Sequence, residues 1–360
     1  MADDGHGGSD WILARMERLI RHIYLLAHNE LKTTVSLYFA AFAKKDERKR
    51  EQVAEGVISD DEYKRWRIGQ MLAGERWIAL RRAIARDYHN ANVTARRVID
   101  GVMPDIYALN MNYMTYSIEK QMGVDTAFTL YNREAVENIL REDPQMLPAP
   151  GKKLAEKIAA GKDILWNNEK IQAVMMLAIL QGDSISDIAD RLERVTEYNR
   201  NNAIRNARTM TTAAENKGRL DAMKRAQSKG IKMNKTWVAT LDYRTRHAHR
   251  ALDGQTVPVD EPFKYGGVEL MEPGDLSAPG WMIYNCRCTM ISQIKGFERD
   301  VSDLSLRKSD KLEGMSYEQW KENRRVDKQS IQTPEEIAKL MRARYAAEYR
   351  KKGKASELYD

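Results

Sequence analysis

The sequence predicts a mainly α-helical protein: a long-helix N-terminal region followed by a small α+β module with short strands and an irregular Pro/Gly-rich loop. Apolar residues recur every three to four positions over most of the first 235 or so residues, as in amphipathic helices. Four of the nine prolines fall at Pro258, Pro262, Pro273 and Pro279, so chain breaks concentrate in one region. A chain of 360 residues exceeds one typical core, so we expect two or three structural units.

The N-terminal helical region is predicted to span residues 1–150. Its first ten residues contain three glycines, and we expect them to be flexible. Apolar residues at helical spacing then run from Trp11 to Ala27. Ser59 and Glu62 have the spacing of a capping box, in which each residue satisfies a free backbone N–H of the other, so a helix should begin there.

The end of this region contains three further signals. Pro104 should open another helix, since proline fits the first helical turn. Residues 123–131 alternate β-branched and aromatic side chains, which predicts a short strand. The prolines and glycine of residues 144–151 predict a linker.

A second helical region is predicted over residues 151–235. One helix should end at Gly182 and a short one at Leu192, and a long basic helix should run from Tyr198 to Lys229. Small residues share one stripe of this long helix, which permits close packing against a neighbour: Ala203, Ala207, Met210, Ala214 and Gly218.

Charge is unevenly distributed along the chain, whose net charge is +7. Residues 191–250 carry a balance of +10 and residues 251–285 a balance of −5. The two segments can neutralise each other within one domain, or the basic one can face DNA or an acidic protein. Under the second interpretation, Arg205, Arg208 and Arg219 on one flank of the long helix are the expected contact residues.

The small α+β module is predicted over residues 236–297, and a charged C-terminal extension over 298–360. Residues 237–241 and 288–291 have strand character, and their pairing would bring Asp242, His249 and the only two cysteines together. In the extension, Tyr317–Trp320 should anchor a short helix, and Pro334 should open another.

The segment from Trp237 to Cys288 concentrates the chemically capable side chains, and three interpretations stay open. Cys286, Cys288 and His249 are preferred zinc ligands, and Asp242 or His247 would be the fourth. Alternatively, a cysteine thiolate activated by His249 would be a nucleophile, oriented by Asp242 or Asp253, with a thiol pKa lowered by Arg287.

The third interpretation is structural. Asp242, Arg244 and Arg246 would tie a loop to a strand through charge-assisted pairs, and His249 would donate to a backbone carbonyl. Gly254 would supply a turn position with positive φ, and the cysteines would pack as small buried side chains.

The motif resembles the minor head, or head morphogenesis, proteins of tailed bacteriophages, typified by protein F of phage Mu. The resemblance covers residues 185–297. It rests on the pattern W-x4-D-x-R-T-R-x2-H-x2-L-D-G followed by N-C-R-C, formed here by Trp237, Asp242, Arg244, Thr245, Arg246, His249, Leu252, Asp253, Gly254, Asn285, Cys286, Arg287 and Cys288. His247 falls at a variable position of this pattern, which favours Asp242 as the fourth metal ligand.

The resemblance implies a virion protein inside the capsid at the portal vertex, acting in procapsid assembly, DNA packaging or DNA ejection. It implies the portal protein as a partner, with coat or scaffolding protein and nonspecific contact with packaged DNA as further expectations. It implies no enzymatic activity. The alternative function is a metal- or thiol-dependent hydrolase or nuclease using His249, Asp242 and Cys286.

The sequence also sets expectations about the compartment. The start lacks a basic stretch followed by an apolar core, so no secretory signal is expected. The longest apolar run, residues 173–180, is shorter than the roughly 20 residues that span a bilayer. Two cysteines one residue apart do not form a disulfide framework, so synthesis in a reducing bacterial cytoplasm is expected.

Overall fold

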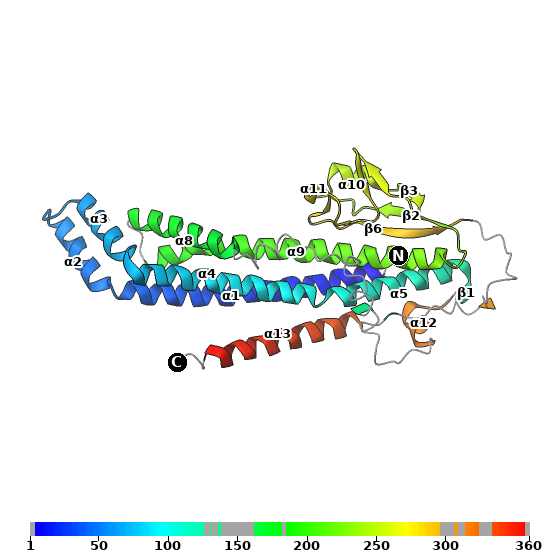
Figure 1. Cartoon of the computed structure of the whole chain (residues 1–360), viewed down its shortest axis with the longest axis horizontal. Helices are drawn as coiled ribbons and strands as arrows, with labels where there is room; N and C mark the ends of the chain where they lie inside the picture. Colours follow the sequence, from blue (N-terminus) through cyan, green and yellow to red (C-terminus); the bar gives the residue numbers. More distant parts are fainter. Residues whose placement is uncertain are drawn as a thin grey trace. The chain divides into compact units, whose positions relative to one another are not determined.

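The computed structural model is mainly helical with a few short antiparallel strands, which confirms the predicted fold class (Figure 1). It describes residues 4–125, 131, 136–137, 162–181, 185–295, 307–308, 314–323 and 333–356. The predicted linker at 144–151, Gly182, and residues 126–130 of the predicted strand lie outside the described residues. No helix in the described ranges is long and apolar enough to cross a membrane.

The helices are α1 Asp4–Ala40, α2 Ala43–Ala54, α3 Asp60–Met71, α4 Gly74–Asp100, α5 Met103–Met122, α8 Lys162–Leu180, α9 Ile185–Gln227, α10 His247–Leu252, α11 Gly280–Ile283, α12 Tyr317–Asn323 and α13 Pro334–Ser356. The strands are β1 Val124–Asp125, β2 Met233–Val238, β3 Thr256–Pro258, β4 Phe263–Tyr265, β5 Val268–Leu270, β6 Thr289–Ile294 and β7 Arg307–Lys308.

The chain forms two compact units, each built from separated stretches. The first comprises Met1–Glu17, Val98–Pro150 and Arg205–Asp360, and the second comprises Arg18–Arg97 and Gly151–Ile204. Helices α1, α4 and α9 each contribute residues to both units. The division into four consecutive segments at residues 150, 235 and 297 stays a prediction.

The second unit is a helical core. Buried apolar side chains from α1, α4, α8 and α9 meet there, among them Val35, Ile84, Met175 and Leu192. The predicted capping box is present at the start of α3, where the Ser59 and Glu62 side chains bond each other's backbone N–H.

Helix α9 is continuous where the sequence predicted two helices, so the predicted end at Leu192 is wrong. Residues 193–197 contain neither glycine nor proline, and two of them, Val195 and Thr196, are buried. The Thr196 hydroxyl is 2.7 Å from the Tyr88 hydroxyl on α4. Burial of this stretch favours helix over a break.

The first unit begins with the glycine-rich N-terminus, which is helical from Asp4, so the predicted flexibility of the first ten residues is wrong for the described residues. A Cβ atom on Gly5 would lie 2.8 Å from the Tyr113 ring, and one on Gly8 would lie 3.0 Å from Leu109. The missing side chains therefore let α1 approach α5 closely, and the buried contacts offset the poor helix propensity of glycine.

The small-residue stripe on α9 also packs closely, as predicted. A Cβ atom on Gly218 would lie 2.5 Å from the carbonyl oxygen of Tyr107 on α5. Ala207 and Ala214 of the same stripe are buried. Helices α5 and α9 therefore approach to backbone contact at Gly218.

The α+β module contains a three-stranded antiparallel sheet in the order β3-β2-β6 and a β4-β5 hairpin. The predicted pairing of the two strands is present, with Trp237 opposite Met290. Strand β2 starts at Met233 and ends at Val238, earlier than predicted. Trp237 is buried against Phe263 in the apolar core, with ring centroids 5.3 Å apart.

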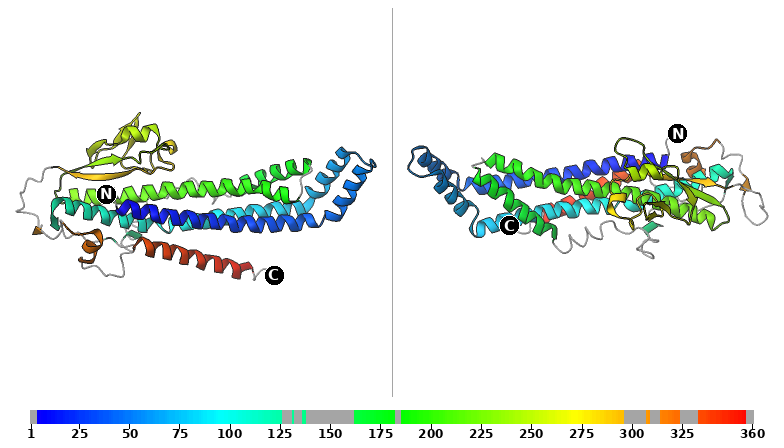
Figure 2. Two further views of the ribbon diagram at one scale, coloured as in Figure 1. Left: turned by 180° about the vertical axis from the view of Figure 1, so that it is seen from behind. Right: turned by 90° about the horizontal axis from the view of Figure 1, so that it is seen from above.

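Strand β6 lies along α9 in Figure 1 and in the left view of Figure 2, and side chains of α9 bond the backbone of β6 and of the residues just before it. The Thr212 hydroxyl donates to the carbonyl of Cys286 (2.5 Å) and the Asn216 amide to that of Cys288 (3.0 Å). Arg219 donates to the carbonyl of Met290 (3.2 Å). Donors about one helical turn apart thus meet every second carbonyl, and we call these three contacts the α9–β6 ladder.

The C-terminal extension contributes two described helices. On α12, Trp320 is buried and donates from its indole nitrogen to Glu119 (2.6 Å), which confirms the predicted anchor. Helix α13 begins at Pro334, as predicted. Strands β1 and β7 pair antiparallel.

Candidate metal centre

Three of the predicted ligands meet in the core of the α+β module. His249 lies on α10, Cys286 follows α11, and Cys288 immediately precedes β6. The His249 Nδ1 atom is 3.3 Å from the Cys288 sulfur and 3.8 Å from the Cys286 sulfur. The three donor atoms lie within 4.8 Å of one another, and each side chain is at most 3% exposed.

A hydrogen bond fixes the orientation of the His249 ring. Its Nε2 atom is 2.7 Å from the carbonyl oxygen of Met282. Because a carbonyl only accepts, Nε2 must carry the proton, which leaves the Nδ1 lone pair facing the two sulfurs. Metal-binding histidines are commonly oriented by a bond of this kind to a backbone carbonyl.

The N-C-R-C sequence accounts for the placement of the cysteines. Asn285 adopts a left-handed backbone conformation (φ 53°), which asparagine tolerates better than most residues, and its N–H donates to Thr209 (3.2 Å). Cys286 and Cys288, two positions apart, then face His249, while Arg287 between them bonds Asp242 on the other side.

The two thiols have opposite pKa shifts. The hydrogen bond from the Cys286 thiol lowers the pKa of Cys288. The same bond, together with burial, raises the pKa of Cys286 well above its ordinary value. Two sulfurs and one imidazole nitrogen therefore converge, and this is a donor set that suits zinc.

Neither candidate for a fourth ligand belongs to this group. Asp242 accepts two hydrogen bonds from Arg287, at 2.6 and 2.7 Å, and one from the Arg244 backbone N–H at 2.9 Å. The bonds from Arg287 hold the pKa of Asp242 far below its usual range. His247 is exposed and bonds the Tyr265 hydroxyl at 3.0 Å. Within the described residues, the metal-competent group is therefore His249 with the two cysteines.

The same geometry argues against a cysteine nucleophile activated by His249. Both sulfurs are buried, whereas a nucleophile must reach its substrate. Neither predicted orienting acid is bonded to His249, since Asp242 binds Arg287 and Asp253 accepts from the Ala239 N–H (2.8 Å). The structure therefore does not assemble a Cys-His-Asp arrangement.

The remaining motif residues tie the module together. Thr245 donates to the carbonyl of Thr240, and Arg246 donates to the carbonyl of Tyr284. Gly254 has φ 74° in the turn after α10, as predicted. The Arg244 side chain is exposed, and its guanidinium forms a long ion pair with Asp242 (3.6 Å). These contacts agree with the structural interpretation of the motif, except that the main partner of Asp242 is Arg287.

The structure does not bring the three arginines predicted on α9 onto one free surface. The Arg205 guanidinium lies over the Tyr284 ring, 4.8 Å from its centroid. Arg208 forms a two-bond ion pair with Glu17 (2.6 and 3.2 Å). Arg219 is fully buried and bonds Asn110 and Met290, so it cannot contact DNA or a partner in this structure.

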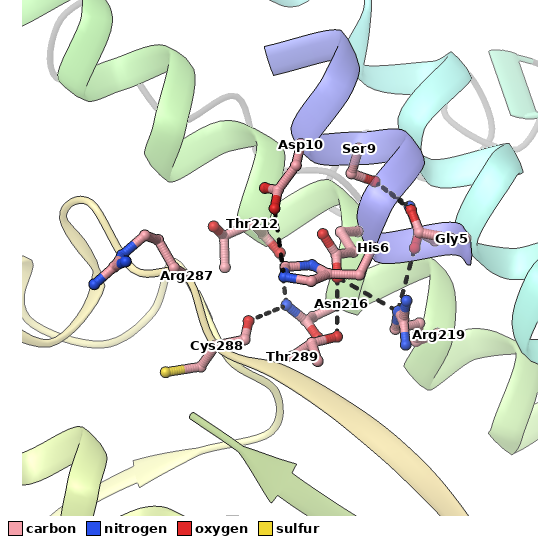
Figure 3. Close-up of polar contacts among 12 residues, drawn as sticks. Gly5, His6, Ser9, Asp10, Thr212, Asn216, Arg219, Arg287, Cys288 and Thr289 are labelled. Carbon is pink, nitrogen blue, oxygen red and sulfur yellow. Dashed lines mark hydrogen bonds and ion pairs between the residues drawn. The ribbon is translucent and has the colours of Figure 1, made fainter. Parts of the chain in front are cut away.

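A polar network beside the cysteines was not foreseen from the sequence. His6 on the first turns of α1 reaches the α9 side chains, with Asn216, Arg219 and Thr289 gathered around it (Figure 3). Its Nδ1 atom is 2.9 Å from the buried carboxylate of Glu215, which also accepts from Thr289 (2.9 Å). Nothing in the glycine-rich sequence around His6 predicts a long-range partner.

This network predicts a dependence of stability on pH. The hydrogen bond with Glu215 raises the pKa of His6 to about 9, and Asp10 and Arg219 are the other charged groups facing it. A raised histidine pKa stabilises the folded state below the unfolded value of about 6.5, and that contribution is lost as pH rises through 9.

We therefore expect the free energy of unfolding to fall by on the order of 1–2 kcal/mol between pH 6.5 and 9.5 because of His6 alone. The measurement is urea unfolding of wild type and His6→Gln at both pH values. The difference between the two proteins isolates His6 from other groups that titrate in this range. Equal pH dependence in both proteins would contradict the assignment.

One protein-family model matches the part of the chain that contains this site. Residues 169–291 match the family model described as Phage Mu protein F like protein, so the resemblance inferred from the motif is confirmed. The match spans the ladder residues of α9, strands β2 and β3, the first half of β6 and the three metal-competent side chains.

Two curated relatives are similar over longer stretches. The chain is 26% identical over 294 residues to the minor head protein GP7 of Bacillus phage SPP1, covering 80% of this chain and 85% of the relative. It is 28% identical over 209 residues to the NAD(+)--arginine ADP-ribosyltransferase EFV of Enterococcus faecalis, covering 57% of this chain. The chain spans only 40% of the length of that second relative. No solved structure matches this chain.

Proposed function

We propose that this chain is a minor head protein of a tailed bacteriophage and acts in head morphogenesis. The observation that carries the proposal is the similarity to the SPP1 minor head protein, which extends over most of both chains. We further propose that it lies inside the capsid at the portal vertex, and that it serves procapsid assembly, DNA packaging or DNA ejection. The portal protein is the proposed main partner, with coat or scaffolding protein as further candidates.

The test is genetic and structural. The gene is deleted from the phage that encodes it and restored from a plasmid with a tagged copy. We expect purified particles to contain the tagged chain in few copies, and reconstruction of the portal vertex to show added density inside the head. Particles that lack the chain, combined with normal yield and infectivity of the deletion phage, would refute the proposal.

We propose zinc as the ion held by His249, Cys286 and Cys288. Support comes from the donor set, the close convergence of the three donor atoms, and the orientation of the imidazole by Met282. Bound zinc would join α10, the turn after α11 and the start of β6, and would add to the stability of a small module. The chemistry it supplies under this proposal is structural cross-linking.

We expect the chain purified without chelator to carry about one zinc per molecule by elemental analysis, and the Cys286→Ser/Cys288→Ser variant to carry none. His247→Ala is the matched control, because this exposed histidine two positions from His249 lies outside the group, and it should keep the metal. Zinc retained in the double variant, or absent from wild type refolded with zinc, would contradict the site.

We propose that the chain is not an enzyme. The similarity to an ADP-ribosyltransferase covers only 40% of that protein, so the activity in its name need not reside in the shared part. The buried cysteines and the carbonyl-bonded His249 do not favour a hydrolase or nuclease. Assays of purified chain with DNA and peptide substrates should show no turnover that is lost in His249→Ala.

Nonspecific contact with packaged DNA stays a proposal, and of the three predicted arginines it can use only Arg205 and Arg208, which are partly exposed. The burial of Arg219 removes it from such a surface. Contacts to phosphates would be independent of sequence and would weaken as salt rises.

A further inference from the structure

The α+β module exposes large apolar and aromatic side chains beside arginines on two neighbouring segments. In the loop after β2, Tyr243 is 89% exposed and Leu241 is 64% exposed. On and just after α11, Trp281 is 54% exposed and Tyr284 is 42% exposed. Exposed tryptophan and tyrosine are unfavourable in water and typical of the energetic centres of protein interfaces.

Direct contacts hold these two segments together. The Thr240 hydroxyl donates to the carbonyl of Arg287 (2.8 Å). Arg287 in turn holds Asp242 through two hydrogen bonds, and Arg246 donates to the carbonyl of Tyr284. The exposed residues lie next to these hydrogen-bonded residues, so their backbone is held in place. A rigid support reduces the entropy lost on binding.

The charge of this surface is positive. Arg244 and Arg250 are exposed, and Arg246 and Arg205 are half-buried beside Tyr284. The acid in this loop, Asp242, is already neutralised by Arg287. Arginines therefore lie beside Tyr243 and Tyr284, and the complementary partner is acidic.

We propose that Leu241, Tyr243, Trp281 and Tyr284, with Arg244 and Arg250, form the surface through which this chain docks onto an acidic, partly apolar face of another head protein. We call it the aromatic–arginine surface. Duplex DNA fits it less well, because stacked base pairs offer no exposed face to leucine, tyrosine or tryptophan, and phosphates would use only the arginines. The inference rests on the proposed function, since it presupposes a particle in which the chain assembles.

The test uses the complementation experiment with a Tyr243→Ala/Trp281→Ala variant and, separately, Arg244→Glu. We expect each to lower the number of copies per purified particle by about tenfold or more, because interface aromatic and arginine residues carry most of the binding energy. The control is Leu37→Ala/Leu177→Ala, which removes two exposed apolar side chains elsewhere in the chain and should not change the copy number.

The outcomes separate the surface from the function. Wild-type chain absent from particles refutes the proposed function itself. Wild-type chain present, with both surface variants incorporated equally well, overturns only the surface. Normal incorporation together with weaker binding of the purified variants to duplex DNA would identify a DNA surface and overturn the protein-docking proposal. Unchanged circular dichroism and thermal unfolding of each variant show that the comparison is between folded proteins.

Discussion

Replacing Arg219 by alanine is expected to lower the free energy of unfolding by about 3–5 kcal/mol, because it removes one partner of a buried charged group. The guanidinium is fully buried and contacts Glu215 (3.5 Å), the Asn110 side chain (3.2 Å) and the Met290 carbonyl (3.2 Å). Its loss leaves the carboxylate and the carbonyl with fewer donors in a low-dielectric interior. Urea unfolding followed by tryptophan fluorescence measures the change.

The matched control is Arg208→Ala on the same helix. Arg208 is 40% exposed and its ion pair with Glu17 is partly solvated, so its loss should cost no more than about 1 kcal/mol. If both substitutions lower the free energy of unfolding equally, the buried contacts of Arg219 do not contribute the expected stability. An Arg219→Met variant, which keeps much of the side-chain volume, distinguishes lost polar contacts from lost packing.

Substituting Gly218 by alanine is expected to destabilise the protein by about 1–3 kcal/mol, although alanine is the better helix former. The added methyl group would lie 2.5 Å from the Tyr107 carbonyl oxygen, a backbone atom that cannot move without shifting α5. Circular dichroism during thermal unfolding gives the change in stability.

Gly69→Ala supplies the comparison, because Gly69 is also within a helix but a Cβ atom there meets nothing within 4 Å. That substitution should stabilise by up to about 1 kcal/mol through helix propensity alone. A Gly218→Ala protein as stable as wild type would mean that α5 and α9 can separate at little cost.

Local signals allowed much of this fold to be predicted. The capping box at Ser59, Pro104 near the start of α5 and the pairing of the strands around Trp237 depend on residues close in sequence or on period-two alternation. The convergence of His249 with both cysteines followed from that pairing. The helix starts and the strand segments could be predicted because neighbouring residues decide them, and the pairing was inferred from the presence of two such segments in one small module.

Features that depend on long-range burial could not be predicted in the same way. The N-terminal glycines favour flexibility on their own, and only the close approach of α5 makes them helical. Arginine is usually a surface residue, so nothing local predicts that Arg219 is buried. Its hydrogen-bond partners, Asn110 and Met290, are more than 70 positions away in the sequence. Asp242 could equally have been a metal ligand, and only the position of Arg287 decides its partner.

The α9–β6 ladder has a consequence for how this module can vary and assemble. Thr212, Asn216 and Arg219 bind carbonyl oxygens, which every residue type possesses, so the outward side chains of β6 can change without loosening its attachment. The same contacts cover the outer edge of the sheet where β6 begins, and an edge of this kind otherwise recruits strands from other molecules. If the chain assembles into a phage head as proposed, this shielding would reduce edge-to-edge aggregation of the chain during assembly.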